Sequence, residues 1–180
     1  MRIGTTLHAV CLLVVLGSAG AQSSNEGLDN FFGRYAGTGI VENSDVDGTS
    51  MTLRNLDVEI RPASRGGFSV GWTSLIRKFG GDVPTYTRKG LELAFVATDR
   101  PGVYREKSPG NVLNGESLTW ARLEHPTLTV YQLVPSERGG FEILSYERTL
   151  SDQGMDLVFK RLVDGEEVRT VKGALERLSD

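Results

Sequence analysis

The sequence predicts an all-β protein with a single domain, an antiparallel up-and-down β-barrel of about 8–10 strands. From Phe31 onward, apolar and polar residues alternate along successive segments, which is the period of a strand with one buried face. Turn-forming dipeptides separate these segments at intervals of roughly 8 to 18 residues, which suits antiparallel neighbours and is too short for crossover helices. An antiparallel chain with this many strands avoids exposed edges by closing into a barrel or packing as a sandwich.

The turn signals contain glycine with asparagine, aspartate, proline or a second glycine, whose backbone preferences suit hairpins. They are Asp47-Gly48, Gly66-Gly67, Gly80-Gly81, Pro101-Gly102, Pro109-Gly110, Asn114-Gly115, Gly139-Gly140 and Asp164-Gly165. Alternation is clearest over residues 68–76, 91–95 and 155–160. Gly37 and Gly39 fit a bend of a barrel strand, where a side chain would be crowded. Short helices are expected only over 26–32 and 173–179, because no longer segment after residue 21 keeps a helical apolar stripe.

Residues 1–21 have the pattern of a secretory signal peptide. Arg2 supplies a short basic region, residues 9–16 are apolar, and the small residues Ala19 and Ala21 fit the site that signal peptidase prefers. The apolar run is shorter than the roughly 20 residues that span a bilayer. We therefore expect cleavage after Ala21, a flexible leader over 22–30, a barrel domain over 31–180, and a secreted or periplasmic location without a membrane span.

Composition excludes several classes of function for the exported chain. Residues 22–180 number 159 and carry a net charge of −4, because the removed segment contains Arg2 and no acidic residue. A nucleic-acid-binding or anionic-membrane-binding protein needs a basic surface, so we expect neither partner. Cleavage also removes Cys11, the only cysteine, and His8, one of two histidines. The exported chain would have no disulfide and no cysteine ligand for a metal. Composition leaves the oligomeric state open.

Residues 31–39, Phe-Phe-Gly-Arg-Tyr-Ala-Gly-Thr-Gly, resemble the first strand of the lipocalin-like or calycin barrels. In that family a short turn leads into a strand carrying Gly-x-Trp, and Gly33-Arg34-Tyr35 matches it with tyrosine in place of tryptophan. The resemblance implies that Tyr35 plugs one end of the barrel beneath a basic side chain from late in the chain. Arg169 and Arg177 are the candidates for that side chain.

Motifs for metal binding or catalysis are incomplete. Residues 43–48 match the first half of a calcium loop, but Arg54 stands where the loop needs a bidentate glutamate, so an acidic hairpin loop is the preferred interpretation. His125 precedes Pro126 between two strands and is expected in an exposed turn. The carboxylate pairs Asp45/Asp47 and Glu166/Glu167 are sequence neighbours on turns, whereas glycosidases need two carboxyl groups facing across a cleft. We expect no metal, no cofactor and no catalytic residue.

Aromatic residues in the predicted strands carry the hypothesis of a binding site. Their large apolar surface and single polar atom suit the wall of a small-molecule cavity, although they equally suit a filled core. The candidates for ligand binding are Tyr35, Trp72, Trp120, Tyr131, Tyr146 and Phe159. Polar residues also interrupt the apolar strands, namely Arg122, Gln132, Glu142, Arg148 and Arg161. If some of them point inward, the interior is a polar-lined pocket; if all point outward, they are solvated.

The sequence therefore favours a secreted protein that reversibly binds a small apolar or amphipathic molecule inside a barrel, without catalysis. One alternative is an enzyme of the cyclase or isomerase type, which positions its substrate with aromatic residues and a carboxylate. A buried carboxylate with an arginine partner in the pocket would favour that enzyme. Another alternative is an envelope accessory domain that binds a protein partner and has no cavity. An enclosed pocket separates the first two hypotheses from the third.

Overall fold

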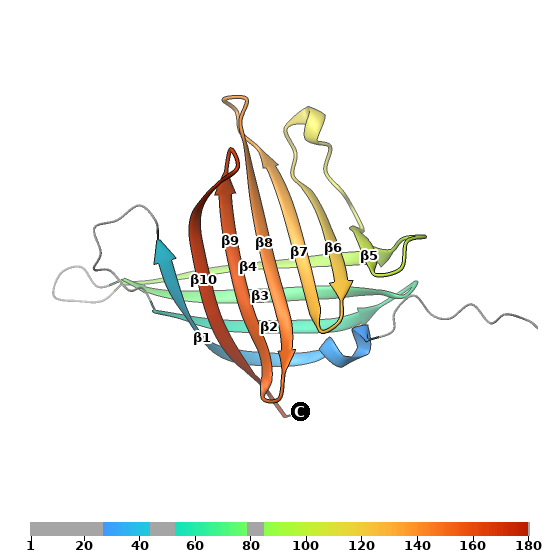
Figure 1. Cartoon of the computed structure of the whole chain (residues 1–180), viewed down its shortest axis with the longest axis vertical. Helices are drawn as coiled ribbons and strands as arrows, with labels where there is room; N and C mark the ends of the chain where they lie inside the picture. The colour runs from blue at the N-terminus through green and yellow to red at the C-terminus, as the bar shows by residue number, and fades with distance from the viewer. Residues whose placement is uncertain (1–26, 44–52, 79–84, 180) are drawn as a thin grey trace, which may run out of the picture.

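The computed structural model describes residues 27–43, 53–78 and 85–179. Within these ranges, ten strands form one closed antiparallel barrel, in which each strand pairs with its neighbours in sequence and β1 pairs with β10 (Figure 1). This confirms the predicted fold class. No helix in the described ranges has the length and apolar character needed to cross a membrane.

The strands are β1 (Gly33–Asn43), β2 (Leu53–Ala63), β3 (Gly67–Lys78), β4 (Thr85–Ala97), β5 (Val103–Glu106), β6 (Leu118–Glu124), β7 (Thr127–Pro135), β8 (Phe141–Ser151), β9 (Gly154–Val163) and β10 (Glu166–Arg177). Two short 3-10 helices accompany them, η1 (Leu28–Phe31) before β1 and η2 (Val112–Asn114) between β5 and β6. Figure 1 shows β6 to β10 rising across the front of the molecule, while β2 to β4 run across behind them.

The predicted turns lie between strands wherever the structure describes them. Gly66, Gly102, Gly139 and Gly165 have positive φ angles of 66°, 72°, 86° and 92°, a region that glycine enters without steric cost. They join β2 to β3, β4 to β5, β7 to β8 and β9 to β10. Gly115 ends η2, with a φ of 81°. The dipeptides Asp47-Gly48 and Gly80-Gly81 fall outside the described residues.

Strand β1 bends from the back layer to the front layer, pairing with β2 over its first part and with β10 over most of its length (Figure 1). A Cβ atom at Gly37 would lie 2.0 Å from the carbonyl oxygen of Ala174 on β10. Gly39 pairs with Gly173, and a Cβ at either position would come within 2.9 Å of Leu56 Cδ1. Glycine is therefore needed where the strand turns and packs closely, as the sequence predicted.

One end of the barrel is filled by an aromatic plug. Leu28 and Phe31 of η1 are 1% and 0% exposed and belong to the same core cluster as Phe68, Phe95 and Tyr104. Phe68 stacks on Phe95 with ring centroids 4.9 Å apart, and Tyr104 meets Phe68 edge-on at 5.1 Å. A flexible leader was expected over 22–30, but the chain is already packed at Leu28 because η1 covers this end of the barrel.

The prediction of a short helix over 173–179 is wrong. Residues up to Arg177 continue β10, which pairs with β1 on one side and β9 on the other. Val171 and Leu175 are buried, while Lys172 and Glu176 are exposed. This period of two matches the pleat of a strand, and the small residues Gly173 and Ala174 allow the close approach of β1.

Candidate functional site: a cavity inside the barrel

The half of the barrel away from the plug contains a cavity of about 510 Å³. Its walls come mainly from inward-facing residues of β2, β3, β4, β8, β9 and β10, at the end where β2, β8 and β10 begin. The volume falls within the range of small-molecule sites. Two larger hollows of about 740 and 970 Å³ are lined mainly by outward-facing residues of the strands and turns and lie on the outer surface.

An aromatic cluster forms one wall of the cavity. Trp72 on β3 and Tyr146 on β8 have ring centroids 4.7 Å apart, so they meet across the interior, and Phe159 on β9 follows Tyr146 at 4.9 Å. Leu144 and Val171 add aliphatic surface. Such a wall removes apolar ligand surface from water, which contributes about 25 cal/mol per Å².

Arg148 is the deepest residue that β8 contributes to the cavity, and it is 0% exposed. Its guanidinium carbon lies 5.2 Å from the centre of the Trp72 ring and 5.8 Å from that of Tyr146, within the range of cation–π contacts. Nη1 donates a hydrogen bond to the Tyr146 carbonyl oxygen at 3.3 Å. Burial lowers the pKa of Arg148 to about 10, so the group is still a cation at neutral pH.

An ion pair lies at the cavity end of β8 and β9. Arg161 donates from Nε and Nη2 to the two carboxylate oxygens of Glu142, at 2.9 and 2.6 Å. These hydrogen bonds hold the pKa of Glu142 below its ordinary value and raise that of Arg161. The side chains of Arg161 and Glu142 are 36% and 31% exposed, so the pair lies at the edge of the cavity rather than in its depth.

Three more polar residues line the cavity on other strands. Arg54 on β2 is half-buried, and its pKa is lowered by burial and then by the charge of Arg169 on β10. Ser74 lies on β3 one inward-facing position beyond Trp72. In the described part of the chain, four buried side-chain polar atoms have no hydrogen-bond partner: Arg54 Nε, Ser74 Oγ, and Arg148 Nε and Nη2. All four belong to residues that line this cavity.

The structure brings three of the six predicted aromatic residues together in the cavity, namely Trp72, Tyr146 and Phe159. Tyr35 lies in the plug instead, where it is 1% exposed. Its hydroxyl donates to the Phe31 carbonyl oxygen at 3.0 Å and accepts from Arg177 Nη2 at 2.6 Å. The Arg177 guanidinium covers the Tyr35 ring at 5.1 Å, so the prediction of a late arginine over Tyr35 is confirmed for Arg177 and not for Arg169.

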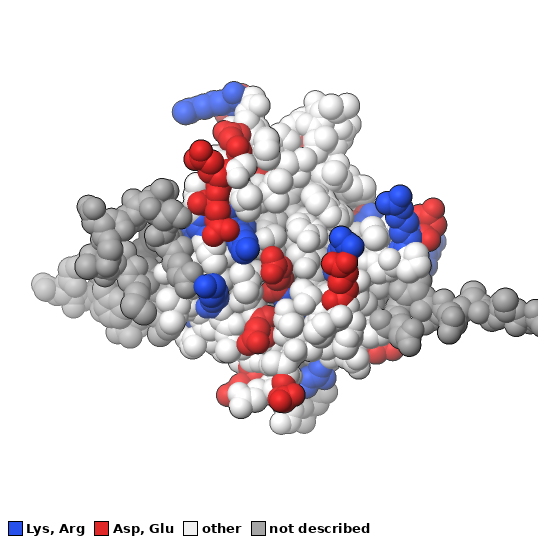
Figure 2. Space-filling model, viewed as in Figure 1, with Lys and Arg blue, Asp and Glu red and all other residues white. Residues whose placement is uncertain are grey.

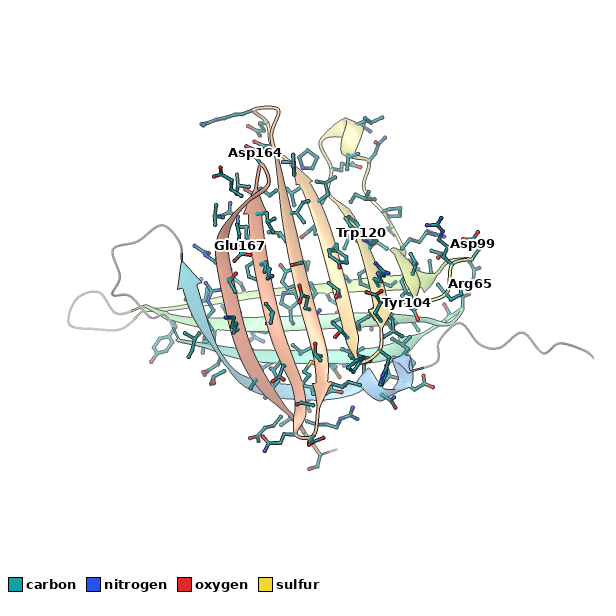
Figure 3. The ribbon with its side chains drawn as sticks, in the orientation of Figure 1. Arg65, Asp99, Tyr104, Trp120, Asp164 and Glu167 are labelled. Atoms are coloured by element: carbon teal, nitrogen blue, oxygen red, sulfur yellow. The ribbon has the colours of Figure 1, made fainter. Side chains whose placement is uncertain are left out.

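Trp120 and Tyr131 do not line the cavity. Trp120 lies on the outer face of the front layer (Figure 3), and Tyr131 stacks on it from the same face. They pair across β6 and β7 and stack with ring centroids 5.2 Å apart. Their buried neighbours Ala121 and Val130 occupy the inward-facing positions of the same strands. The alternation of β6 and β7 therefore directs both aromatic rings outward.

The polar residues of the strands divide between the two faces. Glu142, Arg148 and Arg161 line the cavity, which makes the interior a polar-lined pocket. Arg122 is exposed on the outer face and forms an ion pair with Glu124. Gln132 is half-buried on β7 and does not line the cavity.

Sequence reasoning missed Arg54, Ser74 and Arg169 as cavity residues. The signal was present, because Arg54 has the same parity as the buried Leu56 and Val58 on its strand. Ser74 lies within the alternating segment 68–76 and has the same parity as the buried Phe68 and Val70. An arginine at an inward-facing position of a barrel strand either extends toward the open end of the barrel or contacts another side chain inside it.

The other candidate residues that the structure describes lie in or beside turns of the barrel. His125 is exposed between β6 and β7, as predicted. Glu166 and Glu167 begin β10 after the turn at Asp164, near one end of the front layer (Figure 3). Asp45 and Asp47 lie outside the described residues. Within the described ranges, no group of three or more histidine, cysteine, aspartate or glutamate residues could hold a metal ion.

Comparisons with known proteins add little to this geometry. No protein-family model matches the sequence, and no curated protein is significantly similar to it. Among solved structures, the S-type phycobiliprotein lyase CPES from Guillardia theta is similar with a TM-score of 0.40 and 9% identity, over 89% of this chain and 95% of that chain. A likeness of this size carries no information about ligand or activity.

Proposed function

We propose that this protein reversibly binds a small apolar or amphipathic molecule inside its barrel, without catalysis. The observation that carries the proposal is the internal cavity of about 510 Å³ with its wall of Trp72, Tyr146 and Phe159. A filled barrel would leave no such space, whereas a ligand of suitable size would gain contact with three aromatic rings and the aliphatic residues beside them. The contact of Arg177 with Tyr35 supports placing the barrel with the calycins.

The enzyme alternative rests on Glu142 and Arg161, a carboxylate with an arginine partner at the edge of the cavity. Both oxygens of Glu142 already accept hydrogen bonds, and its pKa is lowered. A carboxylate held in this way is a weak general base, because proton transfer favours groups whose pKa lies near the working pH. The geometry therefore supports binding better than catalysis. The cavity also argues against an accessory domain with a filled barrel.

The two tryptophans provide a direct test, because Trp72 lines the cavity and Trp120 lies outside it. We expect the neutral dye N-phenyl-1-naphthylamine to bind saturably and to quench tryptophan fluorescence. The quenching should be strong in Trp120→Phe, which retains the cavity tryptophan, and weaker in Trp72→Phe, which retains only the tryptophan on the outer face. Stronger quenching in Trp72→Phe than in Trp120→Phe, or none in the wild type, would contradict binding in the cavity.

We also propose that the protein is exported, with Gln22 as its first residue after cleavage. The support is the pattern of residues 1–21, with a basic start, an apolar run and the small residues Ala19 and Ala21. The intact mass of the protein recovered from the envelope or medium of an expressing bacterium should match residues 22–180. A mass that retains residues 1–21 would show that this segment is not removed.

A further inference from the structure

The lining of the cavity has the opposite charge to the chain as a whole. The full chain carries a net charge of −3. The cavity is lined by five basic side chains, namely Arg54, Lys89, Arg148, Arg161 and Arg169, against the acidic Asp57 and Glu142. By contrast, the outer surface over β6 to β10 shows acidic and basic side chains interspersed (Figure 2). A concave site lined by one sign of charge attracts ligands of the other sign.

Arg148 presents a specific geometry for an anion. Its two nitrogens without a hydrogen-bond partner in the described chain are Nε and Nη2, which share one edge of the guanidinium plane. Arg161 in the same cavity uses that edge to bind the two oxygens of Glu142, at 2.9 and 2.6 Å. Two parallel N–H groups on a planar fork match a planar carboxylate, and such bidentate pairs are among the stronger hydrogen-bonded contacts in proteins.

The contacts around Arg148 leave it without a countercharge. Tyr146 and Trp72 contribute ring faces and one carbonyl oxygen, and neither residue is an anion at neutral pH. No salt bridge joins Arg148 to any residue in the described ranges. The carboxylate of Glu142, at the edge of the same cavity, is already paired with Arg161. A fully buried cation is costly unless it is paired and hydrogen-bonded, so an anionic group bound here would relieve that cost.

We propose that the cavity selects an amphipathic carboxylate, whose carboxylate group binds the Nε and Nη2 atoms of Arg148 and whose apolar part lies against Tyr146, Phe159 and Leu144. This inference rests on the proposed binding function and specifies its ligand class. The molecule enters with its charged group first, because Arg148 is the deepest residue of β8 in the cavity. Arg54, Lys89 and Arg169, nearer the end of the barrel, increase the local concentration of anions during entry.

The test compares three ligands with ten-carbon chains: decanoate, whose tenth carbon is the carboxyl carbon, decanol and decyltrimethylammonium. Each competes against bound N-phenyl-1-naphthylamine at pH 7 on the wild-type protein. Hydrogen bonds to a charged group predict that decanoate binds on the order of ten- to hundredfold more tightly than decanol. The cation should bind most weakly. Because the contact is buried, the preference for decanoate over decanol should persist at about 0.5 M salt, where exposed charges are screened.

Matched variants assign the preference to a residue. Arg148→Met keeps the length and apolar stem of the side chain, and Arg122→Met makes the same change on the outer face. We expect the first variant to bind decanoate and decanol about equally and the second to behave as wild type. Arg148→Lys keeps the charge without the fork, so it should retain only part of the preference. Arg148→Lys also provides the test if Arg148→Met does not fold.

The outcomes separate the two proposals. Equal affinity of the wild type for decanoate and decanol would overturn the carboxylate inference and leave the binding function intact. If the dye does not bind, and titration calorimetry detects no binding of any of the three ligands, the binding function itself is overturned. A preference that survives in Arg148→Met and Arg148→Lys but disappears in Arg54→Met would overturn the assignment to Arg148.

Discussion

Replacing Arg148 with methionine is expected to stabilise the ligand-free protein. Burial lowers the pKa of this guanidinium to about 10, from an ordinary value above 12. Since one pKa unit corresponds to about 1.36 kcal/mol, the buried charge costs on the order of 3 kcal/mol of folding free energy. Loss of the contacts with Trp72 and Tyr146 offsets about 1 to 2 kcal/mol of the gain. The net increase in the free energy of unfolding is then about 1 to 2 kcal/mol.

Urea denaturation at pH 7 measures this difference, with Arg122→Met as the control, for which we expect a change within about 0.5 kcal/mol. The cost is fully present below pH 10, where Arg148 is protonated in both the folded and the unfolded chain. Above pH 10 the unfolded chain binds more protons at this site, so the wild type should gain stability relative to Arg148→Met. A loss of about 2 kcal/mol or more in Arg148→Met at pH 7 would refute the reasoning, because Arg148 would then support the fold.

Three other substitutions test separate parts of the structure. Glu142→Gln should lower the free energy of unfolding by less than about 1 kcal/mol at pH 7, because the Glu142–Arg161 pair is about a third exposed. Since the pKa of Glu142 is lowered in the folded protein, this stability is present above the ordinary pKa and is lost as the pH falls through the folded value. The melting temperatures of wild type and variant should therefore converge below about pH 4. Tyr35→Phe removes the hydroxyl that bonds Phe31 and Arg177 and should cost about 1 kcal/mol by urea denaturation, whereas no change would exclude a stabilising role of these bonds. Gly37→Ala should prevent or severely weaken folding, since its Cβ would lie 2.0 Å from a backbone oxygen. The control Gly71→Ala, whose Cβ would lie 3.9 Å from its nearest neighbour, should melt within a few degrees of wild type. Equal melting temperatures for the two variants would contradict the close packing of β1 on β10.

The fold could be predicted because its determinants are local. The alternation of Phe68, Val70 and Trp72 fixes which face of β3 is buried, and glycine dipeptides mark most of the turns. The turn between β8 and β9 at Asp152 and Gln153 was missed because it contains no glycine or proline. The strand at 173–177 was missed because residues 174–177, Ala-Leu-Glu-Arg, are all good helix formers when taken alone.

The site could be predicted only in part, because its composition depends on which faces meet across the barrel. Tyr146 and Phe159 occupy inward positions, and so does Trp72, but Trp120 and Tyr131 have the opposite parity to Ala121 and Val130. Counting parity along 118–134 would have placed both rings outside. The contact of Arg148 with Trp72 joins β8 to β3, two strands that share no hydrogen bonds, so no pattern within one segment reveals it.

The most direct test of binding inside the barrel is an isotope-filtered NMR experiment on the full-length or exported protein with unlabelled decanoate. We expect nuclear Overhauser effects between the alkyl chain of decanoate and the side chains of Leu144, Phe159 and Val171, which line the cavity. No such effects should reach Trp120 or Tyr131 on the outer face. Contacts confined to Trp120 and Tyr131, with none to the cavity residues, would contradict a ligand-binding barrel interior.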